Sequence, residues 1–275
     1  MILEFPSMLD YGLERSAEVL TRAFEDYFVR IPFPVPVLLK LARADSVDLS
    51  LSRVFVRDGI AAGAGLIARR GWSCRLAGMG IIKEARRSGV GRAAVIQFLE
   101  EAKARGDRTM FLEVIEQNAA ALALYRATGF QTIRRLVGFS GIVESAVPSG
   151  PGDLNEVDLR EVAAALTRFG LPDLPWQLSG ETIAQLGPPD VGYRLDEAWI
   201  AITDPTQPIV TVHALISEPS RPDCATALLR AVIAKHPGKT EWRFNPKWPE
   251  EMAPLIEPVG LPRSALAQWQ MRRAL

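Results

Sequence analysis

The chain has 275 residues, enough for two domains of ordinary size, and 48% of them are hydrophobic and 23% charged, as in folded globular proteins. Lysine plus arginine and aspartate plus glutamate both number 32, so the net charge is zero, and this argues against nucleic acid as the main partner. The cysteines, Cys74 and Cys224, are far apart, and His213 and His236 lie near neither another histidine nor a CxxC pair. We therefore expect neither a disulfide framework nor a metal site.

The N-terminal segment, Met1–Pro6, lacks the charged start and apolar run of a signal peptide. No apolar run reaches the length of a membrane span. We expect a cytoplasmic protein that binds neither membrane nor nucleic acid.

Hydrophobic spacing and turn residues predict an alternation of helices and strands in the first half. In chain order, we expect a helix over 16–28, an irregular proline-rich stretch over 31–36, a helix over 37–44, strands over 51–57 and 60–69 joined by the Asp58–Gly59 turn, a strand over 74–82, a helix over 88–105 ended by Gly106, a strand over 109–115, a short helix from its cap Asn118 to Gly129, and a strand over 130–139.

A run of serine, proline and glycine at residues 145–152 is the clearest linker in the chain. It divides the sequence nearly in two, and each half has the usual size of one domain. We therefore predict two domains, 1–145 and 146–275.

Between the strand over 74–82 and the following helix lies a basic turn that contains glycine. A turn that leads into a helix aims backbone N–H groups into one concavity, and the helix N-terminus adds partial positive charge, so it favours a pyrophosphate. The following residues, Arg92-Ala93, exclude a Walker loop, and Ala94 replaces the third glycine of a dinucleotide fingerprint. On these residues alone, a plain turn at a helix start remains the alternative. The turn comprises Arg86, Arg87, Ser88, Gly89, Val90, Gly91 and Arg92.

The segment Arg86-x-x-Gly89-x-Gly91 resembles the acetyl-CoA pyrophosphate motif of the GNAT N-acetyltransferase superfamily. Downstream, residues 111–130 resemble that family's Leu-Glu-Val, Asn, Leu-Tyr and Gly-Phe block, in the form found in ribosomal-protein alanine N-acetyltransferases. The two blocks cover roughly residues 75–140. The resemblance implies that acetyl-CoA lies between the strands over 74–82 and 109–115.

That resemblance also implies which residues hold the cofactor. The Arg86–Arg92 turn would bind the pyrophosphate, while Met79, Gly80 and Ile81 would follow the pantetheine, with the backbone of Met79 and Ile81 pairing with it. Asn118 would hydrogen-bond the pantetheine arm, although a simple N-cap is an alternative role for it.

Tyr125 stands at the tyrosine of the Leu-Tyr element, where the resemblance implies a general acid for the departing CoA thiolate. A phenol of pKa about 10 is able to protonate a thiolate whose conjugate acid has a pKa of about 8.5. The alternative is an aromatic ring packed on the sheet with its hydroxyl group satisfied.

Glu113 matches the glutamate of the Leu-Glu-Val element, which implies the general base that deprotonates the acceptor amine. On a central strand its carboxylate would be partly desolvated, which favours proton uptake. The alternative is a structural ion pair with a neighbouring arginine. Glu84 and Glu116 are the next candidates for the base.

The acceptor pocket is predicted after the first helix, at Phe24, Glu25, Asp26 and Tyr27. Acids at the mouth of a pocket would attract a protonated amine. A solvated helix end followed by a packed proline loop is the alternative interpretation.

The second half resembles a degenerate copy of the first. Aligning Glu84 with Glu218 places Met79 opposite His213, and Gly129-Phe130 opposite Gly260-Leu261. The phosphate turn becomes residues 220–225, which contain no glycine and an added acid. We expect this half to pack, to shape a substrate channel or to form a homodimer.

The fold expected is a mixed, mostly antiparallel α/β sheet flanked by helices, the acyl-CoA N-acyltransferase fold, duplicated in tandem. The function expected is acetyl transfer from acetyl-CoA to a primary amine, on a small molecule or a peptide, by direct attack in a ternary complex without a metal. The alternatives are a longer acyl group, a hydroxyl acceptor, or a non-catalytic regulator that binds acyl-CoA. The sequence does not identify the acceptor.

Overall fold

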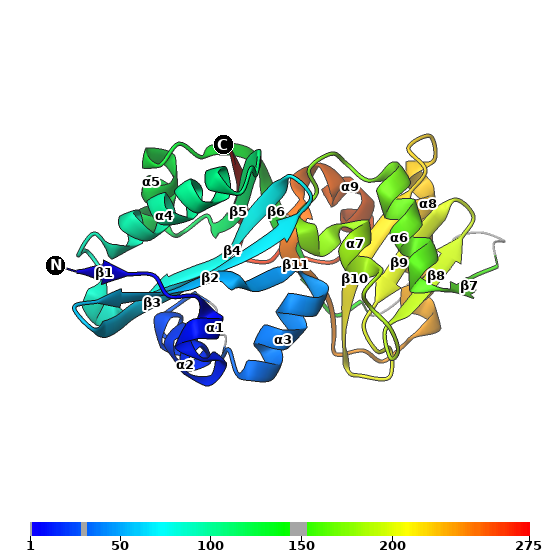
Figure 1. Cartoon of the computed structure of the whole chain (residues 1–275). Helices are drawn as coiled ribbons and strands as arrows, with labels where there is room; N and C mark the ends of the chain where they lie inside the picture. Colours follow the sequence, from blue (N-terminus) through cyan, green and yellow to red (C-terminus); the bar gives the residue numbers. More distant parts are fainter. Residues whose placement is uncertain (1, 29–31, 144–152) are drawn as a thin grey trace. The chain divides into compact units, whose positions relative to one another are not determined.

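The structure is a computed structural model that describes residues 2–28, 32–143 and 153–275. The chain divides into two compact units, which are drawn with the rest of the chain in Figure 1. Unit 1 consists of Met1–Val114, Asn118–Ile133 and Gln270–Leu275, and unit 2 of Ile115–Gln117 and Arg134–Trp269. The segment predicted as a linker, residues 145–152, lies outside the described residues.

Unit 1 is a sheet in the order β1-β2-β3-β4-β5-β12. Neighbours from β1 to β4 are antiparallel, whereas β4 and β5 are parallel. Its strands are β1 (Leu3–Glu4), β2 (Val47–Arg57), β3 (Ile60–Arg70), β4 (Ser73–Ile81), β5 (Thr109–Ile115) and β12 (Gln268–Ala274), and its helices are α1 (Met8–Tyr11), α2 (Leu13–Ala23), α3 (Val35–Ala44), α4 (Val90–Ala104) and α5 (Ala119–Ala127), with the 3₁₀ turn η1 (Lys83–Ala85) before α4.

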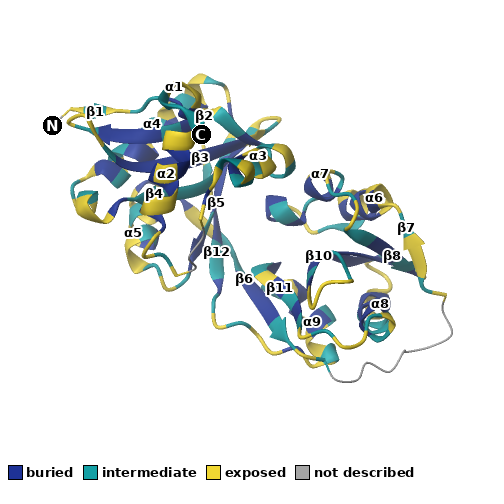
Figure 2. Ribbon diagram, turned by 90° about the horizontal axis from the view of Figure 1, so that it is seen from below, coloured by how far each residue is buried: buried dark blue, intermediate teal, exposed yellow. Residues whose placement is uncertain are grey.

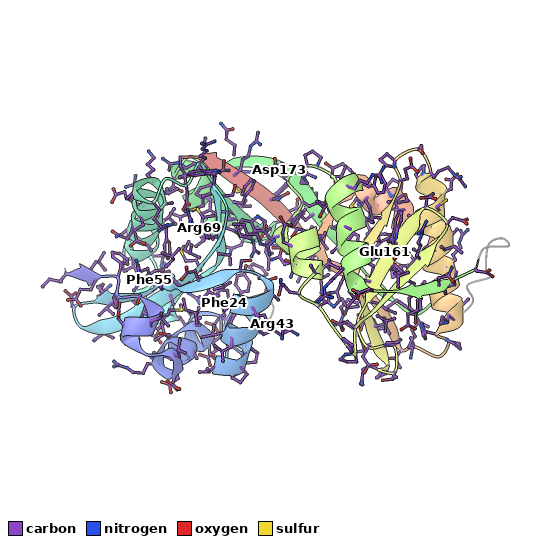
Figure 3. The ribbon with its side chains drawn as sticks, turned by 45° about the vertical axis from the view of Figure 1, so that its right-hand side comes forward. Phe24, Arg43, Phe55, Arg69, Glu161 and Asp173 are labelled. Carbon is purple, nitrogen blue, oxygen red and sulfur yellow. The ribbon has the colours of Figure 1, made fainter. Side chains whose placement is uncertain are left out.

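Helices cover both faces of this sheet (Figure 1). On one face the end of α2 approaches β4 so closely that a Cβ atom at Gly80 would lie 2.8 Å from the Cβ of Ala23. On the other face α4 packs on β3, where a Cβ at Gly65 would lie 2.7 Å from the Phe98 ring. Phe24 and Phe55, labelled in Figure 3, belong to these two layers, because Phe24 lies beside Gly80 and Phe55 meets Phe98 edge to face.

The predicted helix over 16–28 ends earlier than expected, since α2 stops at Ala23. Phe24 leaves the helix and buries its ring against Phe33, at 5.2 Å between centroids. Burial of this aromatic ring outweighs continuation of the helix, and the following residues form a turn.

Unit 2 repeats the pattern with the order β6-β11-β10-β9-β8-β7, in which β10 and β11 form the parallel pair. Figure 2 shows that the central strands of both units are buried, while the outer helix faces are exposed. Its elements are β6 (Gln131–Gly141), β7 (Asn155–Val157), α6 (Leu159–Phe169), η2 (Trp176–Leu178), α7 (Gly180–Ile183), β8 (Val191–Leu195), β9 (Ala198–Ile202), β10 (Ile209–Ser217), α8 (Pro222–Lys235), β11 (Glu241–Pro249), η3 (Glu250–Met252), α9 (Ala253–Ile256) and η4 (Glu257–Val259).

A β-bulge occurs at the same place in the central strand of each unit. In β4 the pairing with β3 skips Ala77, and in β10 the pairing with β9 skips His213. The bulges therefore align Ala77 with His213, so the alignment of Met79 with His213 is wrong by two residues. The two glutamates differ in local structure, because Glu84 lies in the 3₁₀ turn η1 and Glu218 lies in the connection between β10 and α8.

The last strand of each half lies in the unit built by the other half. Residues 270–275 belong to unit 1, whereas residues 134–141 of β6 belong to unit 2. Within unit 1, the backbone N–H of Leu275 donates to the Arg108 carbonyl at 3.0 Å. The predicted mixed, mostly antiparallel fold flanked by helices is confirmed. The fold occurs twice in the chain, and each copy contains a strand from the other half of the sequence. The predicted domains, 1–145 and 146–275, remain a prediction.

Because β12 completes unit 1, truncating a buried residue of that strand should destabilise the protein. Met271 is fully buried, so Met271→Ala is expected to lower the free energy of unfolding by about 2–5 kcal/mol. Urea unfolding followed by circular dichroism measures this loss, with Arg272→Ala at the next, exposed position as the control. An unchanged transition for Met271→Ala would contradict the placement of β12 in a packed core.

Candidate active site

The predicted phosphate turn forms a concave backbone between β4 and α4. Arg87 has φ +61° and Gly89 has φ +87°, and the Ser88 hydroxyl donates to the Ala85 carbonyl at 2.6 Å. The first hydrogen bond of α4 runs from Ala93 N to Gly89 O, at 3.1 Å. The N–H groups of the first three helical residues, 90–92, therefore have no acceptor within the helix and point out of its N-terminus. Such a terminus is suited to an anion.

The two glycines of the turn serve different purposes. Gly89 is left-handed, a backbone conformation that costs other residues roughly 1–2 kcal/mol. Gly91 is helical, and a Cβ there would make ordinary contacts of 3.6 Å with Ile81 and Leu124. The fold thus accepts alanine at position 91, whereas a longer side chain would have to pass between Ile81 and Leu124.

Charged side chains surround the turn. Arg86 donates through Nε to the Ile81 carbonyl at 3.1 Å, and Asp26 Oδ2 lies 3.5 Å from Lys83 Nζ and 3.9 Å from Arg86 Nη1. All of these side chains are largely solvent-exposed, so the ion pairs contribute little to stability. Asp26, predicted at the mouth of the acceptor pocket, instead lies beside the phosphate turn.

The strands β4 and β5 diverge beside this turn. Their parallel pairing runs from Ser73–Thr109 to Leu76–Leu112, and no further pair joins 77–81 to 113–115, segments that the structure describes in full. The divergence begins at the Ala77 bulge. Beyond it, the edge of β4 that faces β5 has no strand partner at Met79 and Ile81. The two strands therefore separate beyond Leu76–Leu112, and we call this unpaired stretch of backbone, which leads toward the turn, the slot.

Glu113 lies directly after the last pair of β4 and β5. Its Oε2 accepts from Arg75 Nε at 2.7 Å and from Arg75 Nη2 at 2.5 Å. Both side chains are about 5% exposed. The other oxygen, Oε1, is buried and has no hydrogen-bond partner in the part of the chain that the structure describes. The carboxylate is thus held by one oxygen and keeps the second oxygen unused.

Sequence reasoning anticipated an arginine beside Glu113 but did not identify Arg75. Arg75 is paired with Phe111 across the strands, and Glu113 lies two residues further along β5, so both side chains point to the same face of the sheet. A single charged residue inside the apolar strand 74–77, adjacent to the strand of Glu113, is the signal that would have found it.

Tyr125 lies on α5 and is buried, with its ring edge to face with Phe130 at 5.8 Å between centroids. Burial raises the pKa of its phenol well above the usual value, and the neighbouring Tyr27 phenol raises it further. Tyr125 is therefore protonated at neutral pH, as a general acid must be.

Asn118 and Tyr27 lie close to Tyr125. The Asn118 side chain caps α5 by accepting from Ala121 N at 3.2 Å, which confirms its predicted role as an N-cap. It also hydrogen-bonds the Tyr27 phenol, whose pKa is raised by burial and lowered in part by that bond. Tyr27 and Tyr125 interact electrostatically, so the three side chains form one cluster.

The other residues predicted for the acceptor pocket lie in different surroundings. Phe24 is 7% exposed and meets the Tyr27 ring edge to face at 5.1 Å, so it belongs to the core. Glu25 is exposed to solvent. Of the four predicted residues, Tyr27 is the one that contacts Asn118.

In unit 2 the equivalent site is built differently. The pairing of β10 with β11 also stops early, after Thr211–Arg243. However, α8 begins with Pro222 and carries Asp223 in its first turn, which disfavours an anion. The turn η2 packs against both β10 and β11, and its Leu178 joins the hydrophobic core of the unit. Unit 2 thus keeps the divergent strands without the phosphate turn.

Two features are absent from residues 2–28, 32–143 and 153–275. These residues contain no group of three histidine, cysteine, aspartate or glutamate side chains arranged to hold a metal ion. They also contain no helix long and apolar enough to span a bilayer.

Comparison with known proteins agrees with this geometry. The Acetyltransferase (GNAT) family matches residues 17–130, which include the turn, the slot, Glu113 and Tyr125. Residues 17–130 are therefore similar to a GNAT-family domain. The chain is also 49% identical over 51 residues to the ribosomal protein bS18 alanine N-acetyltransferase of Escherichia coli, an alignment that covers 18% of this chain and 34% of that protein. The chain thus spans about a third of the length of the curated relatives that it matches.

Solved structures match the whole length of the chain. A GCN5-related N-acetyltransferase from Sphaerobacter thermophilus has a TM-score of 0.69 at 15% identity, covering 99% of this chain and 95% of that one. A tandem GNAT protein from the clavulanic acid biosynthesis pathway has a TM-score of 0.66 at 15% identity, covering 99% and 98% of the two chains. At this identity the likeness shows the fold, and it agrees with a tandem arrangement of two GNAT-like units.

Proposed function

We propose that this chain transfers the acetyl group of acetyl-CoA to a primary amine, by direct attack in a ternary complex at unit 1. The proposal rests chiefly on one observation. The slot between β4 and β5 leads to the basic, glycine-containing turn before α4, and the buried Glu113 carboxylate lies where the strands separate. Such a slot suits a ligand with an extended amide arm and a pyrophosphate.

The turn would bind the pyrophosphate through its backbone N–H groups, helped by the charges of Arg86, Arg87 and Arg92. The backbone of Met79 and Ile81 would pair with the pantetheine as a neighbouring strand does. Ligand binding would then compete with Arg86 for the Ile81 carbonyl. The close packing of Gly80 under α2 sets the position of this strand.

Tyr125 would supply the proton that the CoA thiolate takes up as it leaves. Its raised pKa keeps the proton in place until the thiolate forms. A thiolate in a desolvated slot is a stronger base than in water, which reduces the mismatch between the two groups. Tyr27 and Asn118 would keep the phenol in place from the side of the acceptor.

Glu113 would accept the proton of the amine through Oε1, directly or through one water. Arg75 holds Oε2, so only one oxygen is left for a new partner. The same geometry supports the alternative, a structural ion pair without a catalytic role. Of the other candidates, Glu84 is exposed and Glu116 is paired with Arg135 at 2.8 Å in unit 2. Both are therefore less suited to act as the base.

The acceptor is proposed only as a primary amine. The Escherichia coli relative is named for an alanine of ribosomal protein bS18, but the similarity is confined to 51 residues. A non-catalytic acyl-CoA-binding regulator is the alternative from another functional class. The buried, protonated Tyr125 favours the enzyme, because a protein that only binds acyl-CoA has no need of a proton donor.

Release of free CoA from acetyl-CoA, measured with a panel of primary amines, tests the proposed activity. We expect release that depends on the amine and falls about 100-fold in kcat for Tyr125→Phe, the range expected for a lost general acid. Affinity for acetyl-CoA should remain nearly unchanged, because the hydroxyl acts on the leaving group. Single-turnover rates should be compared as well, since slow product release conceals a change in chemistry.

Two results would contradict this. Binding of acetyl-CoA without CoA release for any amine would favour the regulator. An unchanged single-turnover rate for Tyr125→Phe would remove Tyr125 from the mechanism.

Isothermal titration calorimetry should give one acetyl-CoA site per chain, because only unit 1 has the phosphate turn. Gly91→Glu should abolish binding, since it places a long side chain and a negative charge across the N–H groups. Gly91→Ala is the matched control and should bind, because the structure has room for the extra Cβ. Two equivalent sites would show that unit 2 binds the cofactor too.

Glu113→Gln distinguishes a base from a structural ion pair. If Glu113 is the base, the rate should fall at neutral pH and the loss should shrink as pH rises, because free amine no longer needs deprotonation. If the ion pair is structural, breaking it should reduce stability by about 3–5 kcal/mol, with a rate loss independent of pH. The measurements are rate against pH and melting temperature, with Arg75→Met as the companion variant that breaks the pair from the other side.

A further inference from the structure

We propose that Arg273 is a positioning residue that fixes the C-terminal end of α5 and thereby places Tyr125. This inference rests on the proposed function of Tyr125. Arg273 belongs to β12, a strand contributed by the second half of the sequence to unit 1.

Arg273 contacts the two residues that follow α5. Its Nη1 donates to the backbone carbonyl of Thr128, and its guanidinium lies 3.4 Å from the place where a Cβ of Gly129 would stand. Gly129 has φ +86°, so the chain reverses immediately after the helix. The arginine therefore binds at the point where α5 ends.

Thr128 connects this contact to Tyr125. The Tyr125 carbonyl accepts from Thr128 Oγ1 at 3.0 Å, from Thr128 N at 3.1 Å and from Phe130 N at 3.0 Å. Thr128 thus donates to Tyr125 while its own carbonyl accepts from Arg273. The three residues form a short chain of hydrogen bonds from β12 to the helical turn that carries the proposed acid.

The last turn of α5 needs such support. The helix has nine residues, and Tyr125 is the third from its end. Short helices fray at their ends, and the carbonyl groups there carry partial negative charge that a cation stabilises. A small displacement of a reacting group, of about 1 Å, lowers a rate by up to about 100-fold. Arg273 is placed to prevent that displacement.

An open hollow of about 360 Å³ lies beside the contact, lined by Arg92, Ile96, Ala127, Thr128, Gly129 and Arg273. A guanidinium ion is small enough to enter a hollow of this size. The site therefore allows chemical rescue of a variant that lacks the arginine side chain.

A double-mutant cycle between Arg273 and Tyr125 tests the inference. Arg273→Met should lower kcat between about 10- and 100-fold with little change in KM for acetyl-CoA. In the Tyr125→Phe background the same substitution should have almost no further effect, because its effect passes through the phenol. Arg272→Met is the control, since the next residue of a strand points to the opposite face. Arg272 is exposed, and this variant should keep the wild-type kcat.

Chemical rescue by added guanidinium ion gives a second measurement. A purely structural role of Arg273 would not make kcat depend on guanidinium. Low millimolar guanidinium chloride should raise kcat of Arg273→Ala toward the wild-type value and leave Arg272→Met unchanged. If Arg273→Met does not fold, Arg273→Lys enters the same cycle, since it keeps the charge with a single donor group.

Two results would overturn the inference if the wild-type protein still releases CoA in an amine-dependent manner. One is a wild-type kcat for Arg273→Met. The other is a double variant in which the losses of kcat from the two substitutions are independent and multiply. Absence of amine-dependent release from the wild-type protein would instead overturn the proposed function. The two failures are therefore distinguished by the wild-type assay.

Discussion

The site depends on one backbone defect, the bulge at Ala77 after which β4 and β5 no longer pair. Two parallel strands that stayed paired would satisfy each other's N–H and C=O groups and leave nothing for a ligand. Because pairing stops at Leu76–Leu112, the edge of β4 has no strand partner where the chain approaches the phosphate turn. The buried Glu113 follows directly after the last pair, and Arg75 compensates its charge inside the sheet. The bulge at Ala77 thus opens the slot. The burial of Glu113 at the same point makes the ion pair with Arg75 necessary.

Unit 2 shows that the defect alone does not make such a site. It has the same bulge, at His213, and the same early end of parallel pairing. What differs is the start of the following helix, where Pro222 and Asp223 stand in place of a left-handed glycine and a basic turn. The two units therefore share this strand geometry, whereas the left-handed Gly89 and the basic turn before α4 have no counterpart at the start of α8.

Features that depend on local residues were predictable from the sequence. The turn before α4, the cap at Asn118 and the order of elements in the first half follow from glycine, capping residues and hydrophobic periodicity, which act over a few positions. Features that depend on distant partners follow only when the pairing of the strands is considered. No residue close to Glu113 in the sequence indicates that its ion-pair partner is Arg75, which lies 38 residues away. Periodicity also fails at the end of α2, where burial of Phe24 overrides helical continuation.

The exchange of strands between the two halves is the largest feature that the sequence does not predict, and the reason is physical. A single strand such as β12 carries a pattern of burial but no information about which sheet will accept it. The sequence shows that residues 268–274 form a strand, and only the assembled sheet shows that 270–275 complete unit 1.

This exchange has a consequence for how the chain matures during synthesis. Residues 1–133 can acquire most of their local structure early, but β5 keeps an unpaired edge until residues 270–275 have been made and delivered. The hydrogen bond from Leu275 to Arg108 closes a loop that spans more than half of the chain. Contacts between residues so far apart in the sequence form slowly. Until they form, an exposed strand edge is able to pair with another chain and so to start aggregation. The first half therefore cannot complete its sheet until the segment that forms β12 has been synthesised.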